Sequence, residues 1–427
     1  MKKTFLLIHK ALTLIRFNEE SASNFKNFLS LGSGQIVVVV IPIILYPLIL
    51  RRFGGENLAL YIYLTAISAL ASQLIDFGFD SLNLKRFSVN NSSEATVKNL
   101  QVSLCVKFCI WLFFSVFIVI FAAFTHLNAA PMIVALMSLE AVFNNPWYLQ
   151  VLNQTRLIPI HQVVSRIFIL LFSFTTGHFE TFLFLSASTS LLSVGINFSI
   201  IYKTTKQHFD KHLFNGLLND LNILGELRQG SVFFVSRFSS IAGAKSVQLV
   251  GYKFVDPTLI VVLDFLEKML GIASLLFGTA NQAVLASVYR NKSIDVAFLM
   301  IVKFLFASLL LMFVIYFFGD TISVWYFGDE NHNFHNLLPY YVLNIPCIAF
   351  NYFSGITFLV PFGYSNYFNF STIIGFIFIL SAIIFMTITQ VFLSPLALVL
   401  IILAGNISVA LVRLVGVCQI LWRKNSA

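Results

Sequence analysis

The sequence predicts an all-α, polytopic membrane protein with about 12 transmembrane helices in two six-helix lobes. Hydrophobic residues make up 58% of the 427 residues, and charged residues only 11%. The apolar residues gather in about a dozen runs, each near the ~20 residues that a helix needs to cross a bilayer. The longest polar connection, 203–230, falls at the midpoint and divides the runs into two sets of six.

Six spans are expected in the first half. The first is an aliphatic run that ends before two arginines, the second closes on two aspartates, and the third is continuous and rich in phenylalanine. The fourth is interrupted by Asn144-Asn145-Pro146, because proline lacks a backbone donor and frees a carbonyl that neighbours must satisfy. The fifth and sixth runs are divided by a brief turn. The expected bounds are 28–50, 58–80, 100–124, 131–153, 158–177 and 180–202.

Six more spans are expected in the second half. The seventh is slim and polar, the eighth is long enough to tilt or break, and the rest are strongly apolar. Their expected bounds are 231–252, 257–288, 294–318, 336–360, 366–388 and 392–421. The midpoint connection spaces leucines at helical intervals, which predicts an amphipathic surface helix. The expected segments are an N-terminal segment, a first lobe, a linker, a second lobe and a tail, with bounds 1–27, 28–202, 203–230, 231–421 and 422–427.

The net charge of +9 is explained by membrane topology. With a cytoplasmic N-terminus, 17 of the 27 Lys and Arg residues fall in inside segments, 3 in outside loops and 7 within spans. Basic residues are enriched in cytoplasmic loops of membrane proteins. We therefore expect the N-terminal segment, the linker and the tail to be cytoplasmic, and we expect no nucleic-acid partner.

No motif for hydrolysis or nucleotide binding is present, since the sequence lacks a P-loop, GxSxG, HExxH and GxGxxG. We expect no enzyme activity and no cofactor. The four cysteines lie in apolar runs without zinc-ligand spacing. The outside loop 319–335 carries Asp329, His332 and His335, which we interpret as part of a solvated acidic loop rather than a metal site.

The charges inside the spans are the candidate functional residues, because a charge in hydrocarbon is usually kept for a substrate, an ion or a partner charge. Glu180 and Asp295 stand in the first turn of their spans, where the helix dipole favours a carboxylate. Lys107, Lys303 and Arg413 are interpreted as reaching toward lipid headgroups. We set these five residues aside.

The seventh and eighth spans carry the densest charges. Arg237 and Gln248 share a face of the seventh span, and Lys245 lies about one turn from Gln248. Two cations without an acid on one slim helix predict the wall of a hydrated cavity, although a closely packed helix also explains the small residues. On the eighth span Asp264 can pair with Lys268 at i,i+4, which leaves Glu267 for a cation of the seventh span. A paired cluster and a substrate site both remain open there.

The first half offers further candidates. Glu140 and Trp147 flank the break in the fourth span, where a ring beside polar groups suits a sugar, although Trp147 also fits an interfacial anchor. Arg166 pairs with Gln162 one turn away, while the neighbouring His161 is interpreted as a polar contact. The second span ends in Asp80, for which an ion pair with the nearby Lys85 and Arg86 suffices. Asp76 lies deeper and joins Glu267 and Asp264 as a candidate for ion coupling.

Several stretches resemble the bacterial O-antigen and polysaccharide repeat-unit flippases (Wzx-type) of the multidrug/oligosaccharidyl-lipid/polysaccharide exporter superfamily. They are QIVVVVIPIILYPLILRRFGGENLALYIYL, LIDFGFDSLNLKRFS, PWYLQ, FVSRFSSIAG, DFLEKMLGIASLLFGTANQAVLASVYR and LLPYYVLNIP. The resemblance covers most of 28–420, but it is diffuse and has no single signature. The chain departs from the pattern at Ala59, where glycine is common, and after Gln150, where no Gly-Glu follows.

The resemblance implies a transporter of the bacterial inner membrane. It would move an undecaprenyl-diphosphate-linked oligosaccharide from the cytoplasmic to the periplasmic leaflet by alternating access through a cationic cavity. The resemblance implies that Arg237 is the foremost substrate contact, followed by Lys245, Lys268, Arg166 and Glu140. Expected partners are this glycan lipid, membrane lipids, a polysaccharide polymerase and a chain-length regulator. Transport would be driven by a proton or sodium, if by any ion.

Two other functions stay open. A cation-coupled drug exporter of the same superfamily would want an acidic cavity, and the spans carry equal numbers of acidic and basic residues. The seventh span, with two cations and no acid, favours the flippase. A membrane glycan polymerase or ligase would place its chemistry in a large periplasmic loop, whereas the longest connection here is predicted to be cytoplasmic. Neighbouring glycosyltransferase genes would favour the flippase over the drug exporter.

Overall fold

A computed structural model describes the chain over 40–87, 93–125, 130–152, 154–205, 223–254, 256–291, 294–328, 332–389 and 394–426. Over these ranges the chain is almost wholly helical and contains no strand. Eight of the described helical segments are long and apolar enough to cross a membrane. The predicted all-α, polytopic membrane fold is therefore confirmed.

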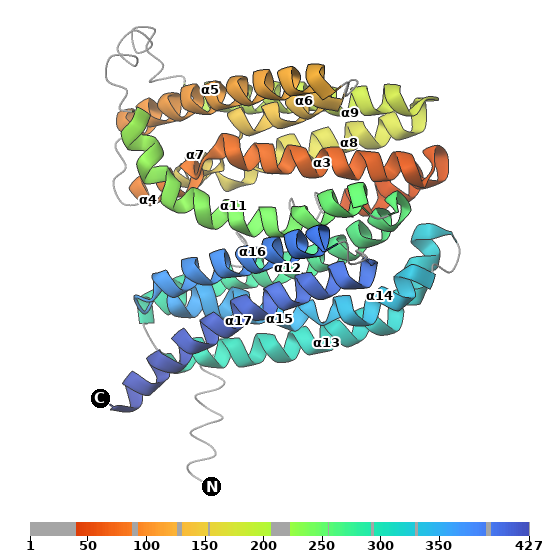
Figure 1. Ribbon diagram of the computed structural model, residues 1–427. Coiled ribbons are helices and arrows are strands. Elements are labelled where there is room, and N and C mark those ends of the chain that lie inside the picture. The colour runs from red at the N-terminus through yellow and green to blue at the C-terminus, as the bar shows by residue number, and fades with distance from the viewer. Residues whose placement is uncertain are drawn as a thin grey trace.

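The first half of the chain forms the upper group of helices in Figure 1. A helical stretch over 40–53 leads into them. They are α3 (Gly55–Asp76), α4 (Phe79–Phe87), α5 (Ser93–Thr125), α6 (Ala130–Phe143), α7 (Pro146–Val151), a 3₁₀ turn (Thr155–Leu157), α8 (Ile160–Thr175) and α9 (Phe179–Thr205). Helix α6 lies at the centre of this group, because it packs against α3, α5 and α9.

The second half forms the lower group, coloured from green to blue in Figure 1. Its helices are α12 (Pro257–Asn291), α13 (Ile294–Phe327), α14 (His332–Val342), α15 (Asn344–Tyr352), a π-helical segment (Phe353–Leu359), α16 (Ser365–Ile388) and α17 (Pro395–Ser426). Helix α17 packs against α15 and α16, and α13 packs against α15. Buried apolar side chains of both groups form one large core, and a smaller separate cluster lies within the first group.

Helix α11 (Ile223–Phe254) lies where the two groups meet, packed against α3 on one side and α16 on the other (Figure 1). It corresponds to the seventh predicted span, whose small residues allow close approach. A Cβ at Gly243, for example, would lie 3.4 Å from the side chain of Ile379 on α16. Any movement of one group against the other therefore changes the contacts of α11.

The helix ends confirm some features of the predicted spans and correct others. The expected break at Asn144-Asn145-Pro146 is confirmed, since α6 ends at Phe143 and α7 begins at Pro146. The eighth span does not break, because α12 is one continuous helix. Of the expected linker helix, 206–222 lies outside the described residues, and the chain from 223 onward already belongs to α11.

The second span ends earlier than expected, at a turn between α3 and α4. Phe77 and Gly78 both adopt positive φ, at 43° and 79°. A Cβ at Gly78 would lie 2.6 Å from the carbonyl oxygen of Gly230 on α11, and the Phe77 ring stacks on Phe234 at 4.5 Å. The turn therefore contacts α11 backbone to backbone, which only glycine permits.

Replacing Gly78 with alanine is expected to destabilise this contact. Strain at a positive φ alone costs about 1–3 kcal/mol, and the overlap with Gly230 adds to it. Gly177, which meets nothing within 4 Å in the described structure, provides the control. The midpoint of thermal unfolding in detergent should fall for Gly78→Ala and stay unchanged for Gly177→Ala. Equal midpoints would contradict the close contact.

Candidate functional site

A cavity of about 500 Å³ lies where the α3–α4 turn, the α6–α7 break and the start of α8 meet. Its wall is formed by Ser72, Gln73, Asp76, Asp80, Ala141, Asn144, Pro146, Gln150, Thr155, Ile158, Pro159, Gln162 and Arg237. All of these residues except Arg237 belong to the first half of the chain. The wall is rich in amides and hydroxyls, with two carboxylates and one guanidinium, so it suits a polar, hydrated ligand.

Asp76 and Asp80, here named the acid pair, lie one turn apart across the α3–α4 turn. The Lys107 ammonium of α5 lies 2.8 Å from Asp76 Oδ1 and 3.1 Å from Asp80 Oδ1. It also donates to Asn145 Oδ1 at 3.1 Å and to the Asn144 carbonyl at 3.4 Å. The Lys107 side chain is fully buried. The α6–α7 break thus supplies oxygen acceptors that complete the surroundings of a buried cation.

Arg237 approaches the acid pair from the opposite side. Its Nη1 lies 3.5 Å from Asp76 Oδ2 and 3.8 Å from Asp80 Oδ2. The Arg237 side chain is 43% exposed, in contrast to Lys107. Each aspartate therefore presents one oxygen to a buried cation of the first half and the other to an accessible cation of the second half.

The sequence led us to interpret Lys107 and Arg413 as residues that reach toward lipid headgroups. Both are buried, so that interpretation was wrong. Lys107 holds the acid pair. Arg413 is 6% exposed, donates from Nε to Ser371 Oγ at 2.9 Å and lies 4.7 Å from the Phe368 ring centre. Both side chains find oxygen or ring partners inside the protein, which removes the need to reach the headgroups. Lys303, in contrast, is exposed on α13.

The predicted local ion pair of Asp80 is also wrong. Asp80 contacts Lys107 and Arg237 instead of the arginine and lysine that follow it in α4. Arg86 pairs with Glu226 of α11 at 2.7 Å and donates to Gln229 at 2.6 Å. These contacts join the end of α4 to the start of α11, beside the Gly78 turn.

Lys245, Gln248, Asp264, Glu267 and Lys268 form a second charge cluster, here named the α11–α12 network. The Lys245 ammonium lies 2.7 Å from Glu267 Oε1 and 3.1 Å from Gln248 Oε1. Gln248 donates to Asp264 Oδ1 at 2.8 Å and also to Glu267. Asp264 pairs with Lys268 at i,i+4, as the spacing predicts. Two ammonium groups and two carboxylates balance, and none of the five residues lines the cavity.

The network reaches the first half of the chain through one cation–π contact. The Lys268 ammonium lies 3.9 Å from the ring centre of Tyr46, in the helical stretch 40–53. Further along the same boundary, the rings of Tyr63 on α3 and Tyr252 on α11 stack at 4.4 Å. Of the two interpretations of this cluster, these contacts support the paired, structural one.

Gln248→Met is expected to destabilise the protein by about 1–3 kcal/mol, because the buried carboxylate of Asp264 and the half-buried carboxylate of Glu267 lose the amide that bonds both. Gln101→Met is the matched control. Gln101 is equally buried, but neither polar atom of its amide has a hydrogen-bond partner in the described structure. That substitution should be neutral or stabilising. Equal unfolding midpoints for the two variants would contradict the structural role of Gln248.

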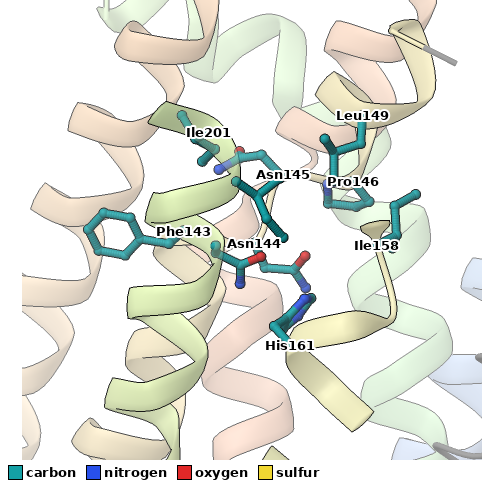
Figure 2. A pocket seen from close by; sticks show the side chains of 10 residues that line it. Phe143, Asn144, Asn145, Pro146, Leu149, Ile158, His161 and Ile201 are labelled. Carbon is teal, nitrogen blue, oxygen red and sulfur yellow. The ribbon is translucent and has the colours of Figure 1, made fainter. Parts of the chain in front are cut away.

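Glu140 faces His161 rather than Trp147. Its Oε1 lies 3.1 Å from Nε2 of His161, which is 1% exposed. His161 borders a second cavity of about 10 Å³, together with Asn144 and Asn145 at the helix break (Figure 2). That volume suits one water molecule. Neither ring nitrogen of His161 has a hydrogen bond of good geometry among the described residues, which is consistent with a water there.

Two further residues that we expected to contact the substrate, Trp147 and Arg166, do not line the cavity. Trp147 is buried in a small core cluster, where it stacks with Phe87 at 5.8 Å. Arg166 is half-buried on α8, while Gln162, one turn before it, does line the cavity. The amides of Gln162 and Gln150 therefore occupy the wall on which the sequence placed a tryptophan.

Within the described part of the chain, no three His, Cys, Asp or Glu side chains are arranged to hold a metal ion. Of the outside-loop residues considered from the sequence, Asp329 lies outside the described residues. His335 instead lies 2.8 Å from Asp320, and both side chains are exposed.

No protein-family model and no curated protein sequence matches the chain. Solved structures do. A structure described as the lipid II flippase MurJ in an inward closed conformation matches with a TM-score of 0.67 and 15% identity, over 90% of this chain and 86% of that one.

Multidrug resistance MATE transporters match as well. An inward-facing conformation has a TM-score of 0.65 and 14% identity, over 92% of this chain and 99% of the transporter. An outward-facing conformation has a TM-score of 0.59 and 14% identity, over 95% and 97%. The chain is thus an all-α, polytopic membrane protein with the fold shared by the MurJ flippase and the MATE transporters.

Proposed function

We propose that this protein is a flippase for an undecaprenyl-diphosphate-linked oligosaccharide, the repeat unit of an O-antigen or related surface polysaccharide. It moves the glycan lipid from the cytoplasmic to the periplasmic leaflet of the bacterial inner membrane. The fold shared with a lipid II flippase supports a lipid-linked substrate. The 17-to-3 distribution of basic residues supports cytoplasmic termini.

The accessible guanidinium of Arg237 is the observation that carries the proposal. It lies on the wall of a 500 Å³ cavity, on the helix at which the two groups meet. Arginine binds phosphate through two parallel N–H bonds, and it keeps its charge inside a membrane. The amides of Gln73, Gln150, Gln162 and Asn144 around it suit sugar hydroxyls. Arg237 would hold the diphosphate while the glycan occupies the cavity.

The placement of α11 where the two groups of helices meet supports alternating access. The two groups of helices would separate at one end while they stay packed at the other, so the cavity opens to one side of the membrane at a time. The lipid tail would remain in the bilayer during this movement. A polysaccharide polymerase and a chain-length regulator would then use the delivered repeat unit.

A drug exporter is the second candidate, because the cavity wall also carries the carboxylates of Asp76 and Asp80. A MATE-type transporter would use such acids to hold a cationic drug. Against this, both carboxylates already face Lys107 and Arg237. A free acidic site is therefore missing from the described cavity wall, and the flippase remains the better proposal.

The surface-polysaccharide profile of a deletion strain tests the proposal. Loss of surface polymer, with lipid-linked repeat units retained on the cytoplasmic side and recovery by the wild-type gene, is the expected result. Repeat units that reach the periplasm unpolymerised would indicate a polymerase instead. Normal surface polymer with raised sensitivity to cationic dyes such as ethidium would favour the drug exporter.

A further inference from the structure

The acid pair is electrically neutral only while the two groups of helices are together. The two aspartates carry two negative charges, and Lys107 supplies one positive charge from the same group. The second positive charge is Arg237, which comes from α11, 161 residues after Asp76. If Arg237 withdraws, one uncompensated negative charge remains beside a fully buried lysine, and such a charge is costly inside a membrane protein.

The geometry determines which atoms lose their partner. The Oδ1 atoms of both aspartates face Lys107, at 2.8 and 3.1 Å, and the Oδ2 atoms face Arg237, at 3.5 and 3.8 Å. The contacts to Lys107 lie within one group of helices, so movement between the groups leaves them intact. Only the Oδ2 atoms are uncovered, and both aspartates line the cavity.

We propose that the acid pair is a proton-binding site that is filled when Arg237 leaves it for an anionic substrate. This proposal deepens the proposed function and rests on it for the movement of α11. Arg237 cannot neutralise the acid pair and bind a diphosphate at full strength at the same time. When the diphosphate takes the guanidinium, a proton from cavity water binds an Oδ2 atom. When Arg237 returns, that proton leaves to water, and the charge is balanced in both states.

A proton fits the vacated position better than a metal cation. The oxygens that a sodium ion would use already surround the Lys107 ammonium. Because this ammonium is fully buried, a sodium ion cannot take its place. A sodium ion at the Oδ2 atoms would need further oxygen ligands to complete its coordination, whereas a proton needs one carboxylate oxygen. Two carboxylates one turn apart, by contrast, readily share one proton, because like charges at close range disfavour double ionisation.

The other charged groups around the acid pair have partners of their own. On α4 and α11, Arg86 pairs with Glu226. On α6, Glu140 faces His161 of α8. On α12, both carboxylates belong to the α11–α12 network. Among the described residues, Lys107 and Arg237 are therefore the two cations that set the charge of the acid pair.

Infrared titration of the purified full chain in lipid nanodiscs tests the proposal. The C=O stretch of a protonated carboxyl group is followed as the pH is lowered. The pH at which the acid pair takes its proton should rise from wild type to Arg237→Lys and again to Arg237→Gln, which at neutral pH should hold about one additional protonated carboxyl. Arg237→Gln/Asp80→Asn should lose that signal, because Asp76 and Lys107 then balance.

Two outcomes overturn the proposal. One is an identical titration in wild type, in the charge-keeping variant Arg237→Lys and in the charge-removing variant Arg237→Gln. The other is an Arg237→Gln protein that shows no added protonated carboxyl but melts at a higher temperature in sodium chloride than in choline chloride, which would indicate sodium. The titration needs no substrate. A shifted titration in a protein whose deletion leaves surface polymer intact would therefore reject the glycan-lipid function while the proton site stands.

Discussion

Arg237→Ala is expected to abolish glycan-lipid export while the protein reaches the membrane in normal amount. Hydrogen bonds to charged groups contribute about 1.5–3 kcal/mol each, so loss of the two N–H donors of the guanidinium should weaken substrate binding by about 100- to 10,000-fold. Arg237→Lys should retain part of the activity, because an ammonium keeps the charge but not the two parallel N–H donors. The measurement is surface polysaccharide in a deletion strain that carries each variant, normalised to membrane expression.

Lys303→Ala is the matched control for this result. Lys303 is also a basic residue within a span, but it is exposed on α13 and does not line the cavity. Its removal should leave surface polysaccharide unchanged. Full activity of Arg237→Ala would reject a cavity role for this side chain, even if the deletion strain lacks the polymer.

Lys107→Met should cause the largest loss of stability. The change removes a fully buried cation from two aspartates and two asparagine oxygens, and a buried ion pair that loses one partner typically costs about 3–5 kcal/mol. We expect a large fall in the thermal unfolding midpoint and in the monodisperse fraction after detergent extraction. Methionine keeps most of the volume of the lysine chain, so the effect reports on charge rather than on a void.

A second substitution distinguishes charge from packing at this position. Lys107→Met/Asp80→Asn leaves Asp76 with Arg237, a neutral arrangement, and should recover part of the lost stability. Lys303→Met should change little. If the double variant is no more stable than Lys107→Met, the ammonium does not act through the acid pair.

The fold was largely predictable because membrane helices follow from local composition. Run length and hydropathy indicate where a helix crosses the bilayer, and Asn144-Asn145-Pro146 marked the break between α6 and α7. The end of α3 was not predictable. It depends on Gly78 meeting Gly230, a contact between residues far apart in the sequence that no local pattern reveals.

Contacts in the site were predictable where the two residues are close in the sequence, and were missed where they join distant helices. Asp264 and Lys268 pair at i,i+4, so spacing alone indicated their contact. Lys107 was missed because its partners lie in other parts of the fold, on α3, on α4 and at the α6–α7 break. Two aspartates one turn apart at a span end, with a lysine two turns into the next span, were the available signal. Trp147 was misplaced because an aromatic ring beside a helix break can face the core as readily as the cavity.

The division of the acid pair's partners between two halves of the chain also has a consequence for biosynthesis. Asp76, Asp80 and Lys107 enter the membrane early, but Arg237 is translated 161 residues after Asp76. At ~5–20 residues per second, the ribosome needs about 10–30 s to supply it. The nascent first half must keep one surplus negative charge hydrated or neutralised throughout that delay. Arrival of the seventh helix is therefore an assembly step, at which this charge is first matched within the protein itself.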